Sequence, residues 1–226
     1  MTRSIQKSRP IREARPPLAG PAGPFHAPGA WRDSAFVVAA ALALRIWHLA
    51  EFSAMPFFRA LQMDARFHAA WAQALLERNW ADPQVYFRAP FYPYFLAALQ
   101  SLTGEVLWTA RIAQILAGAG TVLLAHRLAL RLFSPRWALA AGLLAALLWV
   151  PIHYETELLL EPILTFQTTL LLYLMVRAAD RPPGRGGWLA WGLLLGVAAI
   201  TRPNALIFAP ALPVYAAWAA SRSRSS

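Results

Sequence analysis

The sequence predicts an all-α, polytopic integral membrane protein, and two observations carry that prediction. Hydrophobic residues make up 58% of the 226 residues and charged residues only 14%, with a mean hydropathy of +0.41. Soluble globular domains average about 45–50% apolar and about 25% charged residues. The second observation is that the apolar residues fall into runs near the length that crosses a bilayer, roughly 20 residues each.

We expect six transmembrane helices within one domain, residues 34–220. A Pro- and Arg-rich arm, residues 1–33, precedes it and is expected to be disordered and cytoplasmic, because it cannot bury a core. A short cytoplasmic tail, 221–226, follows the domain. The predicted spans are 34–52, 108–126, 137–152, 158–176, 188–200 and 205–219. The charged residues that end the first span are expected at the lipid–water boundary: Arg45, His48 and Glu51.

The outer loop between the first two spans, 53–104, is too mixed in composition to cross the membrane in one piece. Met63–Arg78 predicts an amphipathic helix that carries Asp64 and His68 along one stripe. Ala89–Leu102 is apolar but only about 14 residues long, which favours an interfacial or re-entrant segment. Counting that segment as a seventh span would invert the topology of everything after it.

Basic clusters set the expected orientation. Six spans with a cytoplasmic N-terminus place the clusters at 127–136, 177–185 and 222–224 inside, and the acidic segment 153–157 outside, as the positive-inside rule requires. The net charge of +10 is therefore a topology signal, and no nucleic-acid partner is expected. The absence of cysteine excludes disulfides, thiolate metal sites and thiol catalysis.

The expected outer face collects the polar residues that could do chemistry, and each also has a plain structural interpretation. Asp64 could be a helix N-cap, and His68 a structural histidine. The aromatic run Tyr86–Tyr94, which includes Arg88 and Tyr92, could be an interfacial belt.

The second half of the chain adds three such residues. Glu157 could simply be solvated, and Arg202 could be an interfacial anchor. If Pro162 occupies the first turn of a helix, Glu161 lies at the positive end of the helix dipole. Together these residues favour a site for a sugar and a phosphate, because a carboxylate accepts a proton from a hydroxyl and arginine binds phosphate bidentately.

In their order, these motifs resemble the GT-C fold glycosyltransferases that use polyprenyl-phosphate sugars, a group with protein-mannosyltransferase-like, aminoarabinose-transferase-like and RgtA/B/C/D-like members. The motifs are Asp64-Ala65-x-x-His68, Arg88-Ala89-Pro90-x-Tyr92-Pro93-Tyr94, the segment 111–133 ending in Arg-Leu-Phe, Glu157-Leu-Leu-Leu-Glu161-Pro162 and Thr201-Arg202-Pro203-Asn204. The resemblance covers roughly residues 34–218. Family members carry more spans, so it implies a truncated N-terminal half. A truncated gene, a fragment and half of a two-chain assembly all stay open.

The resemblance implies an inverting membrane glycosyltransferase of the bacterial inner membrane, with its active site on the periplasmic side. Asp64 and Glu161 would be catalytic, and the substrate-binding residues would be His68, Arg88, Tyr92, Glu157 and Arg202. The partners would be a polyprenyl-phosphate sugar donor, membrane lipid, and a lipid, glycan or protein acceptor. No cofactor is implied with certainty, and a divalent metal stays open. The alternatives are a non-catalytic subunit or remnant that binds the carrier lipid, and a transporter or flippase fragment.

Overall fold

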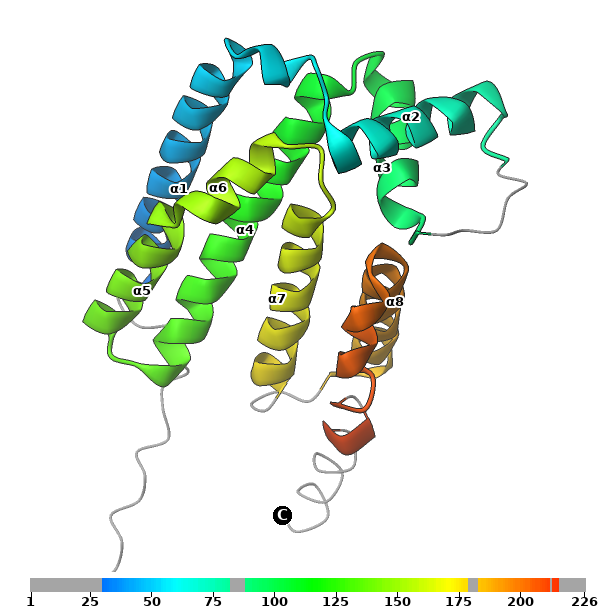
Figure 1. Ribbon diagram of the computed structural model, residues 1–226. Helices are drawn as coiled ribbons and strands as arrows, with labels where there is room; N and C mark the ends of the chain where they lie inside the picture. The colour runs from blue at the N-terminus through cyan, green and yellow to red at the C-terminus, as the bar shows by residue number, and fades with distance from the viewer. Residues whose placement is uncertain (1–29, 82–87, 179–182, 212, 216–226) are drawn as a thin grey trace, which may run out of the picture.

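The computed structural model describes residues 30–81, 88–178, 183–211 and 213–215, and these residues form helices with no strand among them (Figure 1). The α-helices are α1 (Ala30–Ser53), α2 (Met63–Glu77), α3 (Phe91–Thr103), α4 (Leu107–Leu132), α5 (Pro135–Leu147), α6 (Trp149–Thr156), α7 (Glu161–Ala178) and α8 (Arg185–Thr201). Two 3₁₀ helices are also present: η2 (Pro56–Phe58) lies between α1 and α2, and η3 (Pro203–Phe208) follows α8. The all-α prediction is confirmed.

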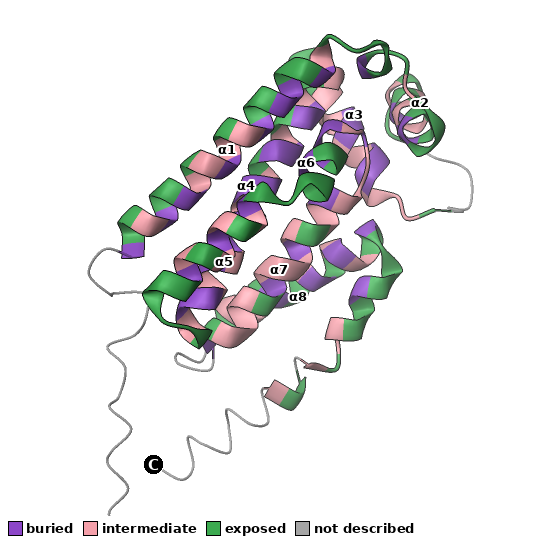
Figure 2. Ribbon diagram, turned by 60° about the vertical axis from the view of Figure 1, so that its left-hand side comes forward, coloured by how far each residue is buried: buried purple, intermediate pink, exposed green. Residues whose placement is uncertain are grey.

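Helix α4 is the centre of the bundle. It packs against α1, α5, α6 and α7, while α8 packs against α7 and the short helices α2 and α3 pack together at one end of the bundle (Figure 1). Buried positions follow the inward faces of α1 and α4, and the outward faces expose large apolar side chains (Figure 2). In a bilayer such outward apolar faces meet lipid.

The number of spans is smaller than expected. Within the described part of the chain, α1 and α4 are long and apolar enough to cross a membrane, and the bent pair α5–α6 would make a third. Helix α8 is apolar but has only 17 residues. The last predicted span, 205–219, begins as the 3₁₀ helix η3, and much of its remainder lies outside the described residues.

Local chemistry explains where the helices begin and end. Gly104, at φ +73°, adopts the left-handed conformation that ends α3, and the Glu105 carboxylate accepts hydrogen bonds from the first two amides of α4, at 2.9 and 2.7 Å. The predicted span 137–152 breaks at Leu148, where α5 and α6 meet at 44°. Pro151 has no amide hydrogen to donate to the preceding turn, which accounts for a break there.

The structure describes only the last four residues of the predicted arm 1–33. Residues 30–33 already form the first turn of α1, with Asp33 near the positive end of the helix dipole. The rest of the arm and the tail 221–226 lie outside the described residues. Helix α2 matches the predicted amphipathic helix, and α3 matches the short apolar segment.

Candidate functional site

The site is built at the end of the bundle where α2 and α3 lie (Figure 1). Asp64 is in the first turn of α2, directly after Met63, whose φ of +43° puts a non-glycine residue in the left-handed region. Such strained residues persist only where their surroundings hold them, and they cluster at functional sites. Asp64 does not act as the expected N-cap, because Gln62 occupies that position.

Asp64 pairs with Arg88, which lies three residues before the start of α3. Arg88 Nη1 donates to Asp64 Oδ1 at 2.8 Å, and the guanidinium lies 4.7 Å from the ring centroid of Phe67. This hydrogen bond lowers the pKa of Asp64 below its usual 3.8, so the carboxylate is ionised at neutral pH. Arg88 commits one of its donors in this contact, and a guanidinium has five N–H groups.

A cavity of about 450 Å³ brings Asp64 and Glu157 together. It is lined by Gln62, Met63, Asp64, Ala65, His153, Tyr154, Glu157 and Leu159. One wall comes from the start of α2 and the other from α6 and the segment that follows it. Carboxylates on both walls, with a tyrosine and a histidine beside them, suit a ligand rich in hydroxyl or ammonium groups.

Glu161 and Arg202 form a second pair, apart from this cavity. Arg202 Nη1 lies 3.3 Å from Glu161 Oε1, and both side chains are partly exposed. Helix α7 begins at Glu161 with Pro162 in its first turn, so Glu161 has the predicted place at the positive end of the dipole. Its spacing of four from Glu157 is not a helical one, because Glu157 precedes α7 in extended conformation.

Glu161 instead borders an apolar cavity of about 360 Å³ between α4, α5, α6 and α7. Gly118, Ala125 and Ala145 make room for it, and Thr121 and Thr165 supply hydroxyl groups. The two acidic residues expected to act together, Asp64 and Glu161, therefore line different cavities. Glu157 is the carboxylate that shares a cavity with Asp64.

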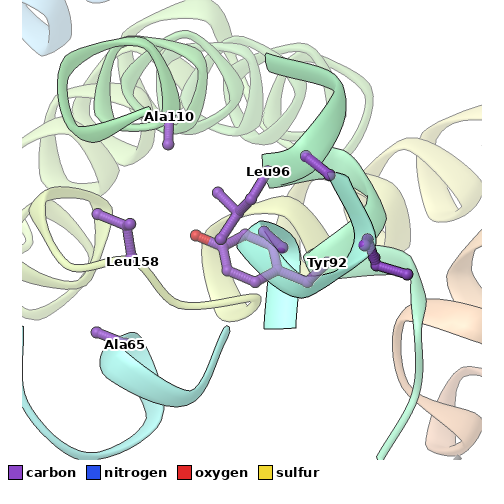
Figure 3. Close-up of a cluster of buried hydrophobic side chains, with 8 residues drawn as sticks. Ala65, Tyr92, Leu96, Ala110 and Leu158 are labelled. Carbon is purple, nitrogen blue, oxygen red and sulfur yellow. The ribbon is translucent and has the colours of Figure 1, made fainter. Parts of the chain in front are cut away.

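His68 and Tyr92 differ from the expectation that they contact substrate. His68 is 2% exposed, and its ring meets the ring of Tyr92 edge-on at 5.1 Å. Tyr92 is fully buried in a cluster with Ala65, Leu96 and Leu158 (Figure 3). Both residues lie beneath the site, because the buried face of α2 carries Ala65 and His68 while Asp64 faces outward.

Burial also decides how these two side chains titrate. It lowers the pKa of His68 to about 4, so the imidazole is neutral at pH 7, and its Nδ1 has no hydrogen-bond partner among the described residues. Burial raises the pKa of Tyr92 well above its usual 10, so its hydroxyl stays a donor, and it donates to Gln114 Oε1.

Sequence reasoning missed a buried ion pair. Arg45 was expected at the lipid–water boundary and Glu155 in the acidic segment on the outer side, yet both are buried, with Nε–Oε2 and Nη2–Oε1 distances of 2.6 and 2.9 Å. The signal was available, because a charge within an apolar span is expected to face the bundle and find a partner. Two further buried polar residues of α4, Arg111 and Gln114, had no signal beyond their position in a span.

Asp64, His153 and Glu157 line one cavity but do not form a metal-binding cluster. Across the described ranges, no group of three histidine, aspartate or glutamate side chains is placed to hold a metal ion. Tyr86 and Phe87 of the aromatic run lie outside those ranges.

Comparison with known proteins shows similarity to sugar transferases. It is 36% identical over 149 residues to the undecaprenyl phosphate-alpha-4-amino-4-deoxy-L-arabinose arabinosyl transferase of Pseudomonas aeruginosa, covering 62% of this chain and 27% of that protein. It is 33% identical over 167 residues to the corresponding transferase 1 of Pseudomonas fluorescens, covering 69% of this chain and 30% of that protein. The chain thus spans less than a third of the length of these relatives.

No solved structure shows a significant match. The family profile described as dolichyl-phosphate-mannose-protein mannosyltransferase matches residues 87–226, a stretch that includes Arg88, Glu157, Glu161 and Arg202. Because that match covers more than half of the sequence, this chain belongs to the dolichyl-phosphate-mannose-protein mannosyltransferase family.

Proposed function

We propose that the chain carries the sugar-transfer site of a membrane glycosyltransferase that uses a polyprenyl-phosphate-linked donor. The observation that carries the proposal is the cavity in which Asp64, paired with Arg88, faces Glu157 at one end of a bundle of apolar helices. Such a place suits a substrate whose lipid part stays in the bilayer and whose sugar reaches the membrane surface. Membership of the family supports the same reaction class.

In the proposed reaction an acceptor hydroxyl or amine attacks the anomeric carbon of the sugar. The bond from that carbon to the phosphate oxygen breaks, and polyprenyl phosphate leaves with the bonding electron pair. Asp64 orients the acceptor and takes its proton, which an ionised carboxylate can do. Arg88 orients that carboxylate and lowers its pKa further, and its remaining donors are available to the donor phosphate.

The relatives act, by name, on an undecaprenyl-phosphate amino sugar. We propose a donor of the same kind here. Arg88 offsets the charge of Asp64 at the edge of the 450 Å³ cavity, and Glu157 adds a second carboxylate to the lining, which holds no lysine or arginine of its own. This acidic lining would favour a sugar with an ammonium group over one with a second anionic group.

For the membrane we propose the orientation that the positive-inside rule favours, with the N-terminus in the cytoplasm and the cavity on the outer side of a bacterial inner membrane. Arg136 lies in the first turn of α5, and the turn between α4 and α5 lies at the end of the bundle opposite α2 (Figure 1). That separation supports an orientation in which the basic residues and the cavity lie on opposite sides of the membrane.

The experiment that tests the function is release of free polyprenyl phosphate from a panel of polyprenyl-phosphate sugars. The full chain is reconstituted in lipid and supplied with membrane extract as the source of acceptor. Release that Asp64→Asn abolishes, and that the control Glu77→Gln on the same helix leaves intact, would establish the transferase. Donor binding without release would favour the alternative of a non-catalytic subunit that holds the carrier lipid.

A further inference from the structure

Two buried polar side chains of α4 have no part in the chemistry proposed above. Arg111 and Gln114 are fully buried, and their spacing of three residues puts them on one face of the helix. Long polar side chains are seldom buried unless hydrogen bonds compensate for their lost hydration. Their partners therefore indicate what they do.

The partners are backbone carbonyls at the end of α6. Arg111 Nε donates to the Thr156 carbonyl at 2.5 Å, and Gln114 Nε2 donates to the carbonyls of Glu155 at 3.0 Å and Glu157 at 2.5 Å. Helix α6 ends at Thr156, and the last carbonyls of a helix have no amide partner within it. Helix α4 thus holds three successive carbonyls, two at the end of α6 and the third at Glu157, which also accepts from the Leu159 amide at 3.0 Å.

The same two residues also bond to segments that adjoin the opposite wall. Arg111 Nη2 donates to the Phe58 carbonyl at 3.0 Å, and its guanidinium lies 4.0 Å from the centroid of the Phe58 ring. Phe58 belongs to η2, the short helix that leads into α2 and Asp64. Gln114 Oε1 accepts the hydroxyl hydrogen bond of Tyr92, at the start of α3. Both walls of the cavity are therefore tied to one helix.

The segment after α6 depends on these bonds. Glu157 is extended, and α7 begins only at Glu161, so residues 157–160 have no helical hydrogen-bond ladder of their own. Leu158 adds an apolar contact with the cluster that contains Ala65, next to Asp64. An apolar contact is non-directional and leaves the rotation of the peptide groups open, whereas hydrogen bonds to three carbonyls fix it.

We propose that Arg111 and Gln114 are positioning residues that hold the segment after α6 so that the Glu157 carboxylate faces Asp64 across the cavity. Their effect on catalysis rests on the proposed function, whereas their effect on the geometry of the cavity does not. Neither residue needs to touch substrate, because each acts through the backbone to which it donates. A displacement of about 1 Å at a reacting group can lower the rate roughly 100-fold.

The test measures the width of the cavity directly. The chain has no cysteine, so Gln62→Cys and Leu159→Cys on the two walls can carry a unique pair of spin labels in the full chain in lipid. We expect Gln114→Leu to shift or broaden the distribution of distances between the labels. The matched control is Gln167→Leu, which changes a buried glutamine of α7 and should leave the distribution as in the parent.

Gln114→Asn keeps the amide on a shorter side chain and provides a second variant if Gln114→Leu fails to insert. In transfer assays we expect kcat/KM for the donor to fall roughly 10- to 100-fold in the Gln114 variants, since the Glu157 carboxylate is no longer held where it binds and aligns the sugar. Unchanged distance distributions in both Gln114 variants would overturn the positioning role. If the Gln114 variants alter the distances and the parent chain releases no polyprenyl phosphate, the positioning role is supported and the proposed transferase is refuted.

Discussion

Arg88 donates a hydrogen bond from Nη1 to Oδ1 of Asp64 at 2.8 Å, and this contact joins the segment before α3 to the first turn of α2. The two residues are 24 positions apart in the sequence. The contact lowers the pKa of the carboxylate on which the proposed chemistry depends. It also aligns the two short helices at the end of the bundle, and the ring of Phe67 packs against the guanidinium.

We expect Arg88→Gln to move the acid limb of the pH–rate profile to higher pH. The hydrogen bond from Arg88 is the largest influence that lowers the pKa of Asp64, so its loss lets that pKa rise. Activity that requires the carboxylate then declines at a higher pH than in the parent. Rates of polyprenyl phosphate release across pH measure the shift. Arg66→Gln on an exposed position of α2 is the control, and an equal shift in that variant would contradict the explanation.

His68 predicts a pH dependence of stability. Its folded-state pKa of about 4 is below the usual 6.5, so the unfolded chain binds the proton first as the pH falls. Stability should be full above about pH 6.5 and decline progressively down to pH 4.

His68→Phe should flatten this part of the profile, whereas His153→Gln at an exposed position should not. Thermal unfolding in detergent at several pH values between 7 and 4 provides the measurement. A profile in His68→Phe as steep as in the parent would exclude His68 as the source.

Arg202→Ala should weaken donor binding far more than it lowers stability. Its ion pair with Glu161 is partly exposed, and such pairs contribute about 0–1 kcal/mol to folding. A guanidinium that binds the donor phosphate would in contrast contribute strongly to affinity. Titration with a polyprenyl-phosphate sugar and thermal unfolding separate the two effects. Arg185→Ala, at the other end of α8, is the control. Equal affinity of Arg202→Ala and Arg185→Ala for the polyprenyl-phosphate sugar would show that Arg202 does not bind the donor.

Gly118→Ala should destabilise the bundle. A Cβ atom at residue 118 would lie 2.1 Å from Oε1 of Glu155, which is held by Arg45 in a buried ion pair. The carboxylate would have to move, and such overpacking typically costs about 1–3 kcal/mol. Gly192→Ala in α8 is the matched control, because its Cβ would meet no atom within 4 Å. Thermal unfolding should show lower stability in Gly118→Ala and unchanged stability in Gly192→Ala. Equal stability of the two variants would contradict the prediction.

The proposed orientation places Arg136 and His153 on opposite sides of the membrane. Both residues are exposed in the structure, so a cysteine at either position should react readily in its own compartment. With intact cells, a membrane-impermeant thiol reagent should label His153→Cys and leave Arg136→Cys unlabelled until the cells are lysed. The cysteine-free parent gives no background. Labelling of both variants in intact cells would refute the orientation.

The amino-acid sequence was sufficient for the fold class, for α1 and α4 as spans, and for α2 and α3 as short helices. These features depend on local quantities, namely the length and apolar character of each run and the spacing of polar residues along it. The place of Glu161 at the start of α7 followed in the same way, from the proline after it.

Only the tertiary structure decided which polar residues meet. Asp64 shares its cavity with Glu157, whereas Glu161 lines another one, because α7 starts too late for Glu157 to belong to it. Glu155 is 110 residues from Arg45, and no local pattern relates them. The burial of His68 and Tyr92 was equally hidden, since the packing of α2 on α3 determines which face of each helix turns inward. Pairing across a bundle depends on contacts between distant segments, which the periodicity of each segment does not encode.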